Sequence, residues 1–398
     1  MITAIAFIVI LGIIIFVHEL GHFAAAKLSG VGVEKFAFGF PPRIWSKKYK
    51  DTEYKINLIP FGGYVKLQGE GEGTEEVELI NVESEKRKKT KNLFDVGTLH
   101  LIFIFSAGVV MNILLAVFTL WILFMIGFKP IELGEMSQNI YSGIKGSQNI
   151  TSTLEAKVVE IEKGTPAEQS LKIGDVIIEV NGKRVFFAGE IITEIQKLRL
   201  NEGVTVNLKI LRQNKEKAVS LTTYKSKVKD RQGTEHEINR VGIVLDTEGK
   251  IQANPFNALI AALKTTGNII KYTLFGIIDL FYGIFTKLQL SENIAGPIGV
   301  VAGTSYYAQL GIGPLVQFAV FLSIGVALFN ILPIPALDGG YVAFTIIESI
   351  IRKKIPIGFK NILTFAGFGA LIILILIVTY RDFISFGVSN YLLNLVGK

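Results

Sequence analysis

Two histidines flank a glutamate near the start of the chain, in the motif H-E-L-G-H at residues 18–22. Residues four apart share one face of a helix, so the imidazoles of His18 and His22 can bind one zinc ion. Glu19 then lies beside the open coordination position, where it can take a proton from zinc-bound water. A lone histidine on an apolar helix is usually a core residue, but here two of the chain's four histidines surround a glutamate. The pattern predicts Zn²⁺ as cofactor and a metalloprotease as the class of enzyme.

This motif lies inside the first long apolar run of the sequence, residues 2–27, which is long enough to cross a membrane. No Lys or Arg precedes Lys27, so the basic start of a cleaved signal peptide is missing and we interpret the run as a retained transmembrane helix. Ionisable groups inside lipid are costly without partners. The sequence therefore predicts a hydrolytic site within the membrane.

The composition is that of an integral membrane protein with a polar domain, because 50% of the 398 residues are hydrophobic and only 19% are charged. The formal net charge of +7 comes from basic residues in loops, which suits the lipid bilayer and its anionic headgroups; we expect no nucleic acid partner. The absence of cysteine excludes disulfides, thiolate zinc ligands and cysteine nucleophiles.

Four segments are predicted to span the membrane: 2–27, 99–128, 314–336 and 359–380. The loop 27–98 carries 13 Lys or Arg, including a run at 86–89, and the short loop 341–360 carries four. The positive-inside rule then puts both loops in the cytoplasm and puts residues 129–257, with both termini, outside.

The segment 258–285 is apolar but is interrupted by Lys264, Lys271 and Asp279. We interpret the region 258–312 as interfacial amphipathic helices and a connector rather than as a fifth span. A fifth crossing would reverse the following span, 314–336, and would separate its C-terminal end from the metal motif. The remaining regions are then the span and its extension at 313–340, a cytoplasmic loop at 341–358, and a tail at 381–398.

A third zinc ligand is expected, because catalytic sites usually have three protein ligands plus water. Pro333 and Pro335 break a helix near membrane depth, and irregular backbone is tolerated there only where protein or water covers it. Asp338 follows this break, ahead of two glycines. Alone, this aspartate would be interpreted as a loop residue at a helix end; with the motif at 18–22 in the same chain, the ligand interpretation is favoured.

Several further motifs make the chain similar to the bacterial site-2 proteases, the RseP/RasP-type intramembrane zinc metalloproteases. They are the H-E-L-G-H motif, the run from Asn330 through Pro333 to Leu337-Asp338-Gly339, Gly108-Val-Val-Met-Asn112, the run from Ile59 to Lys66, and Gly296-Pro-Ile-Gly299. Val109 stands where the family commonly has proline. The resemblance implies that His18, His22 and Asp338 are zinc ligands and that Glu19 is the catalytic base.

The resemblance also implies a substrate site. Asn330 is expected to hold substrate backbone or to steady the developing oxyanion, with Pro333 and Pro335 beside it. Residues 29–98 are expected to contain a membrane-dipping β-loop, with strands near 54–59 and 64–67, whose exposed edge near Phe38, Gly39 and Phe40 pairs with an unwound substrate. Gly108 and Asn112 are expected to seat this loop, although a buried asparagine can equally link helices.

A polar region follows the second span, and its residues 154–224 alternate like strands around the hairpin signal Asn181-Gly182. A helix is expected at 189–200. This stretch resembles a single PDZ domain, which would bind peptide ends, filter bulky ectodomains, or serve only as a structural cap. The expected fold is an α-helical polytopic membrane protein of about four transmembrane helices, with a membrane-associated β-loop and an extracytoplasmic PDZ-like α+β domain at 129–257.

The expected function is hydrolysis of peptide bonds within transmembrane segments, in regulated intramembrane proteolysis. The resemblance implies single-pass membrane substrates such as anti-sigma factors, or remnant signal peptides, at the bacterial inner membrane, with the active site nearer the cytoplasm. Two alternatives remain: a membrane zinc transporter or sensor, and a non-catalytic PDZ scaffold. Glu19 favours the protease over the transporter, because transport needs ligands but no base beside the water.

Overall fold

The computed structural model describes residues 2–70, 90–131, 140–141, 150–198, 203–229, 235–287 and 296–385. The predicted basic run at 86–89 and residues 386–398 of the predicted tail lie outside these ranges. The chain forms two compact units. One contains residues 1–116, 273–309 and 318–380; the other contains residues 117–272, 310–317 and 381–398.

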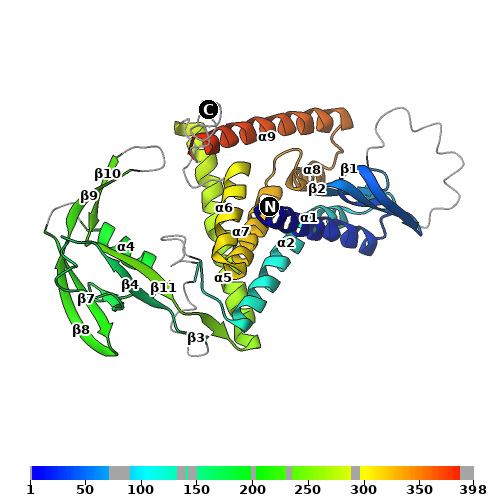
Figure 1. The fold of residues 1–398 in the computed structure, drawn as a ribbon. Helices are drawn as coiled ribbons and strands as arrows, with labels where there is room; N and C mark the ends of the chain where they lie inside the picture. The colour runs from blue at the N-terminus through cyan, green and yellow to red at the C-terminus, as the bar shows by residue number, and fades with distance from the viewer. Residues whose placement is uncertain are drawn as a thin grey trace, which may run out of the picture. The chain divides into compact units, whose positions relative to one another are not determined.

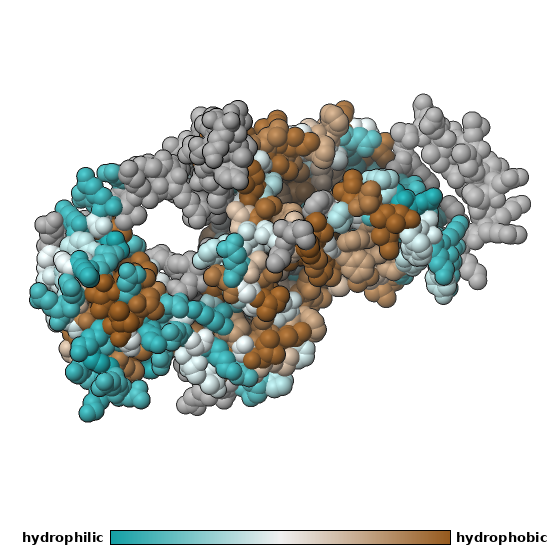
Figure 2. All heavy atoms as spheres, viewed as in Figure 1, coloured by the Kyte–Doolittle hydropathy of each residue, from teal (hydrophilic) through white to brown (hydrophobic). Residues whose placement is uncertain are grey.

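Within the described part of the chain, four helices are long and apolar enough to cross a membrane (Figure 1). They are α1 (Ile2–Leu28), α2 (Thr98–Ile126), α7 (Ile312–Asn330) and α9 (Ile357–Ser385). Their exposed side chains are largely Ile, Leu, Phe and Val, and hydrophobic residues gather over them in Figure 2. Lipid is the solvent that such surfaces require, so the chain is a membrane protein.

The third of these helices is shorter than expected. A span was predicted at 314–336 with an extension to 340, but α7 ends at Asn330 and residues 331–337 form a turn in which Ala336 has a φ of 89°. Pro333 and Pro335 explain the early end, because proline cannot continue the backbone hydrogen bonding of a helix. Helix α7 therefore ends ahead of the two prolines, six residues before the predicted end of the span.

The predicted cytoplasmic loop at 341–358 is largely a helix, α8 (Asp338–Ile351). Asp338 lies in its first turn, where a carboxylate is favoured by the helix dipole. Gly339 and Gly340 follow because a β-carbon at either position would collide with the backbone of the preceding turn, at Ile331 and Ile334 respectively. Only residues 352–356 connect α8 to α9. From the sequence, this segment was interpreted only as a connection between two spans, and no helix was predicted in it.

A long β-hairpin follows α1 and consists of β1 (Val33–Tyr49) and β2 (Thr52–Leu67). The pairing is irregular: residues 35–38 pair with 53–56 on one side and with 63–66 on the other, while 43–49 pair with 52–57. The hairpin therefore has four short arms, and the arm at 35–38 is central. Residues 63–67 and 43–49 form the two outer arms. A short 3-10 helix, η3 (Leu93–Asp95), precedes α2.

The second unit contains a six-stranded sheet in the order β11-β4-β5-β7-β8, with β6 paired to β5. Its strands are β4 (Glu155–Ile161), β5 (Val176–Val180), β6 (Lys183–Arg184), β7 (Thr205–Arg212), β8 (Lys215–Thr222) and β11 (Ile243–Glu248). Helix α4 (Ala188–Gln196) packs into the core through Ile191 and Ile195. It lies where a helix was predicted at 189–200; the last two residues of that range lie outside the described ranges.

Shorter elements complete the described chain. Two small sheets pair β3 (Ile150–Ser152) with β12 (Ile251–Ala253) and β9 (Tyr224–Lys229) with β10 (Glu235–Arg240). The predicted amphipathic region contains α5 (Pro255–Tyr282), the π-helical turn η4 (Gly283–Lys287) and α6 (Pro297–Leu310). Helix α5 is not among the four apolar enough to span, because Lys264, Lys271 and Asp279 interrupt it.

Candidate metal centre

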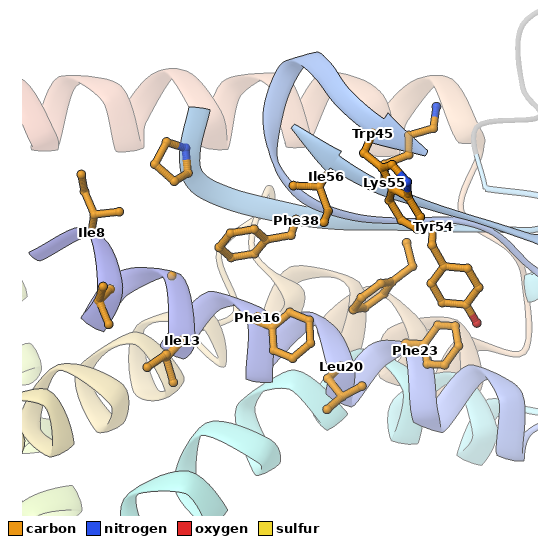
Figure 3. Close-up of a pocket in the computed structure, with 14 residues that line it drawn as sticks. Ile8, Ile13, Phe16, Leu20, Phe23, Phe38, Trp45, Tyr54, Lys55 and Ile56 are labelled. Atoms are coloured by element: carbon orange, nitrogen blue, oxygen red, sulfur yellow. The ribbon is translucent and has the colours of Figure 1, made fainter. Parts of the chain in front are cut away.

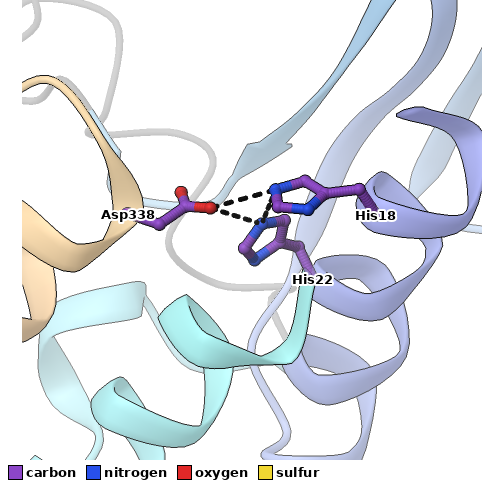
Figure 4. Close-up of side chains that lie close together, drawn as sticks. All are labelled: His18, His22 and Asp338. Carbon is purple, nitrogen blue, oxygen red and sulfur yellow. Dashed lines mark hydrogen bonds and ion pairs between the residues drawn. The ribbon is translucent and has the colours of Figure 1, made fainter. Parts of the chain in front are cut away.

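Three potential zinc ligands converge in the first unit, from segments far apart in the sequence (Figure 4). His18 and His22 lie one turn apart on α1, and Asp338 begins α8. The Nε2 atom of His18 is 3.0 Å from Oδ2 of Asp338, the Nε2 atom of His22 is 3.4 Å from the same oxygen, and the two Nε2 atoms are 3.2 Å apart. The residues that the sequence proposed as ligands are thus brought together.

The donor set fits a zinc ion. Ligands held about 2.0–2.1 Å from a tetrahedral ion stand about 3.3 Å apart, close to the sides of this triangle. His18 is buried at 7% exposure, and the carboxylates of Glu19 and Asp338 border one cavity with it. Two carboxylates this close in a largely buried site need a compensating positive charge. A divalent cation bound by two neutral imidazoles and one carboxylate supplies it.

Helix α2 orients both imidazoles. Nδ1 of His22 is 2.8 Å from the carbonyl oxygen of Ile104, so Nδ1 carries the proton and Nε2 is left as the ligand atom. Nδ1 of His18 is 3.4 Å from the side-chain amide of Asn112, which is fully buried. Such partners of metal-bound histidines hold the ring orientation. Of the two roles expected for Asn112, this contact between α2 and α1 is the link between helices.

Gly108 lies between these two positions on α2 and makes room for the rings. A β-carbon there would be 2.5 Å from Nε2 of His22 and 2.7 Å from Nε2 of His18, which are the ligand atoms themselves. Gly108 was also expected to seat the loop; it instead forms one wall of the centre. Sequence reasoning missed this role, although Ile104, Gly108 and Asn112 are spaced by four and must share one face of a helix.

Glu19 lies beside the ligands and beside the hairpin. It lines a cavity of about 180 Å³ together with Asn330, His18 and Asp338. The backbone N–H of Val65, on the outer arm 63–67, lies near the carboxylate of Glu19. A β-carbon on Gly63 would be 3.1 Å from Cγ of Glu19. The general-base candidate therefore lies between the ligand cluster and a free strand edge.

The remaining predicted substrate residues do not line this cavity. Phe38 points into a separate apolar groove of about 780 Å³ between α1 and the hairpin, opposite Phe16 (Figure 3). Gly39 lies against the backbone of Ile59, and the ring of Phe40 lies against Gly62. The prediction of an exposed edge at Phe38–Phe40 is wrong: Phe38 pairs with both Gly63 and Ile56, so its arm is flanked on both sides.

The two prolines shape the turn that leads to Asp338. Ile334 and Leu337 close it through backbone hydrogen bonds, Ile334 N–H to Leu332 oxygen and Leu337 N–H to Ile334 oxygen. The carbonyl of Pro335 lies against Gly367 of α9, where a β-carbon would collide with it. Neither Pro333 nor Pro335 borders the cavity shared by Glu19 and Asn330. The two prolines end α7, so that α8 begins at the proposed ligand Asp338.

Comparison with known proteins decides the family. Residues 6–374 match the family described as Peptidase family M50. This chain belongs to that family. It is 29% identical to the regulator of sigma-W protease RasP of Bacillus subtilis, over 96% of this chain and 98% of that protein. It is 30% identical to a putative zinc metalloprotease of Fusobacterium nucleatum, over 94% and 96%.

The M50 assignment makes the chain a zinc metalloprotease of the membrane, and its match spans α1 and most of α9. A solved PDZ domain of an SdrC-like protein from Listeria innocua is 25% identical over 23% of this chain, with a TM-score of 0.19. That match covers 92% of the solved domain.

Proposed function

We propose that this M50 peptidase hydrolyses peptide bonds within transmembrane segments, using His18, His22 and Asp338 as zinc ligands and Glu19 as general base. The observation that carries the proposal is the convergence of the three ligand atoms, 3.0–3.4 Å apart, from α1, which can span a membrane, and from α8. His18 is ten residues from the end of α1 at Leu28, or about 15 Å at 1.5 Å per residue. The reaction therefore takes place inside the hydrocarbon layer.

The residues around the ligands can complete the chemistry. Bound zinc would polarise the scissile carbonyl and acidify a water molecule at its open position. Glu19 would remove the proton of that water and later pass it to the leaving amine. Asn330 borders the same cavity, so its side-chain amide can donate a hydrogen bond to the developing oxyanion. The N–H of Val65 lies near the Glu19 carboxylate and would hold it at the cavity's edge.

The substrate is proposed to bind as an added strand on the outer arm 63–67. A transmembrane helix hides its peptide bonds, so its backbone must be extended before a carbonyl can be attacked. Gly63 and Val65 of this arm lie beside Glu19, so the free edge and the base are adjacent. This arrangement replaces the predicted edge at Phe38–Phe40 and explains how an extended segment would reach the water.

The hairpin is proposed to dip into the membrane beside α1. Nζ of Lys27 donates to Thr52 Oγ1 at one end, Phe23 contacts Phe36, and Phe38 lies against Gly12 at the other end. These contacts extend over 15 residues of α1, or about 22 Å. The far end of the hairpin exposes Phe40, Leu58 and Ile59, while the near end is basic. Apolar exposure at depth and charge at the surface are what lipid requires.

The proposed topology is multi-pass in the bacterial inner membrane, with the basic ends of α1 and α9 in the cytoplasm. The strand-rich second unit is then outside and is proposed to be a PDZ domain that binds peptide ends or limits ectodomain size. The relative named regulator of sigma-W protease supports anti-sigma factors as substrates, with remnant signal peptides as a second class. A transporter or a scaffold is not favoured, because the family is one of peptidases and a base adjoins the ligands.

The test is cleavage of synthetic transmembrane peptides by the full-length protein in detergent, with and without a chelator. Cleavage that disappears on chelation, returns with zinc and is absent in Glu19→Gln supports the proposal. A Glu19→Gln variant that binds zinc and still cleaves would remove Glu19 from the mechanism. Cleavage that survives complete zinc removal would remove the metal.

A further inference from the structure

A second cavity in the first unit lies towards the C-terminal end of α8, whereas Asp338 lies in the first turn of this helix. It measures about 630 Å³ and is bordered by the end of α8, the start of α9 and the start of α2. Its wall is mixed: it contains the basic residues Arg352, Lys353 and Lys354 together with apolar side chains such as Leu101 and Ile357. A cavity with a cationic rim and an apolar wall suits an amphipathic anion.

The turn that carries the basic residues is held in place. Oε1 of Glu348 accepts a hydrogen bond from the backbone N–H of Ile355 at 2.7 Å and lies 2.7 Å from Nζ of Lys360. Glu348 thus ties the end of α8 to the start of α9 across residues 352–354. The backbone that carries the three cations is therefore held in place before any ligand arrives, which lowers the entropic cost of binding one.

The three cations have no carboxylate partner among the described residues, since Glu348 is already paired with Lys360. All three are exposed at the cavity rim. Glu70, the other carboxylate bordering the cavity, accepts a hydrogen bond from the backbone N–H of Leu67. The lining therefore has four cationic side chains against two carboxylates, and it attracts an anion.

The level of the cavity in the membrane indicates which kind of anion it binds. Thr98 and Ile357 both border it, and they are the first residues of two helices that can span the membrane. The first residues of two spans that meet at one cavity lie at one membrane surface, at the level of the lipid headgroups. Leu101, one turn into α2, then lies at the level of the first acyl carbons.

We propose that this cavity is a binding site for an anionic phospholipid. The phosphate is held by Arg352, Lys353 and Lys354, and the beginning of an acyl chain packs against Leu101 and Ile357. Basic pockets between membrane helices on the cytoplasmic side are suited to such headgroups. Because α8 has Asp338 in its first turn and the lipid site at its last, a bound lipid would steady the helix that carries the proposed ligand.

The site can be tested with the full-length protein in nanodiscs of phosphatidylcholine containing a photoactivatable phosphatidylglycerol. The variant Arg352→Gln/Lys353→Gln/Lys354→Gln is compared with Lys47→Gln/Lys48→Gln/Lys50→Gln, which removes the same charge from the hairpin tip, outside the lining of this cavity. We expect labelled peptides to map to residues 352–361 and the start of α2. Labelling there should fall at least about tenfold in the first variant and remain within about twofold in the second.

Four results would overturn the proposal. An equal loss of labelling in both variants would mean that any basic surface of the protein attracts the lipid. Displacement of the label by soluble glycerol phosphate at concentrations equal to the lipid would mean a site for free phosphate. Displacement by a transmembrane peptide with an acidic flank, but not by unlabelled phosphatidylglycerol, would mean a subsite for substrate. Undiminished labelling in the first variant would exclude a role for these cations in lipid binding, when both variants fold and bind zinc normally.

Discussion

The role of Gly108 as a wall of the metal centre can be tested by adding one methyl group. In Gly108→Ala, the new β-carbon would be 2.5 Å from Nε2 of His22, whereas an ordinary contact is no closer than 3.4 Å, so this ring must move by about 0.9 Å. A zinc site tolerates displacements of about 0.2 Å in its ligand distances. Overpacking of this kind costs about 1–3 kcal/mol, which corresponds to a fall in zinc affinity of about 5- to 150-fold.

The matched control is Gly325→Ala, which makes the same chemical change within α7, at a position where a β-carbon has no neighbour within 4 Å. We expect this variant to bind zinc as the unchanged protein does. It should also be slightly more stable, because alanine is favoured over glycine in a helix by up to about 1 kcal/mol. The assay is competition for zinc against a chromophoric chelator in detergent, with helix content from circular dichroism as the check on folding. Normal zinc affinity in folded Gly108→Ala would refute the placement of α2 against the two imidazoles.

Three further changes test other contacts. Replacing Asn112 with Ala removes the partner of the His18 ring and should lower zinc affinity about 10- to 100-fold in the same competition assay. Unchanged zinc affinity would show that other contacts hold the ring. Val65→Pro removes the backbone N–H near Glu19 and should abolish peptide cleavage while zinc stays bound, whereas Val65→Ala keeps this N–H and should retain cleavage. Equal activities of the two variants would exclude the strand edge. In the second unit, burial raises the pKa of Asp175, but hydrogen bonds from Arg212 and from Lys172 N–H outweigh this and hold it below its ordinary value. The carboxylate then stabilises the sheet above about pH 4, and this stability is lost as the pH falls through the lowered pKa. Asp175→Asn should lower the stability of β5 and β7 by about 1.5–3 kcal/mol at pH 7 and remove that acid dependence, measured by hydrogen exchange of the full chain; a variant with unchanged exchange would contradict the role of the pair.

The sequence was sufficient for the elements that follow simple periodicity. The long apolar runs at α1, α2 and α9 could be interpreted directly, because a span needs about 20 apolar residues and little else has that pattern. The pairing of His18 with His22 follows from helix geometry. Asp338 could be proposed only because proline and an intramembrane carboxylate are both exceptional at membrane depth. These predictions rest on one element at a time.

Contacts between elements were harder to predict. The edge of the hairpin was placed at Phe38–Phe40, but the irregular register makes that arm central and leaves 63–67 outside. Register depends on bulges and turns that the alternation of side chains does not encode. For Asn112, a contact with the loop and a link between helices stayed equally open, because nothing in α2 alone indicates which neighbour its polar face meets. Helix α8 was missed because its basic C-terminal end was interpreted as a loop.

The central claim is that one zinc ion is held by His18, His22 and Asp338 beside Glu19. Zinc K-edge absorption of the full-length protein, compared with Asp338→Ala and Glu19→Gln, tests it most directly. The account predicts two imidazole nitrogens and an oxygen from the protein at about 2.0–2.2 Å, loss of zinc in Asp338→Ala, and retained zinc without cleavage in Glu19→Gln. An unchanged zinc environment in Asp338→Ala would contradict it, as would a spectrum that lacks two imidazole ligands.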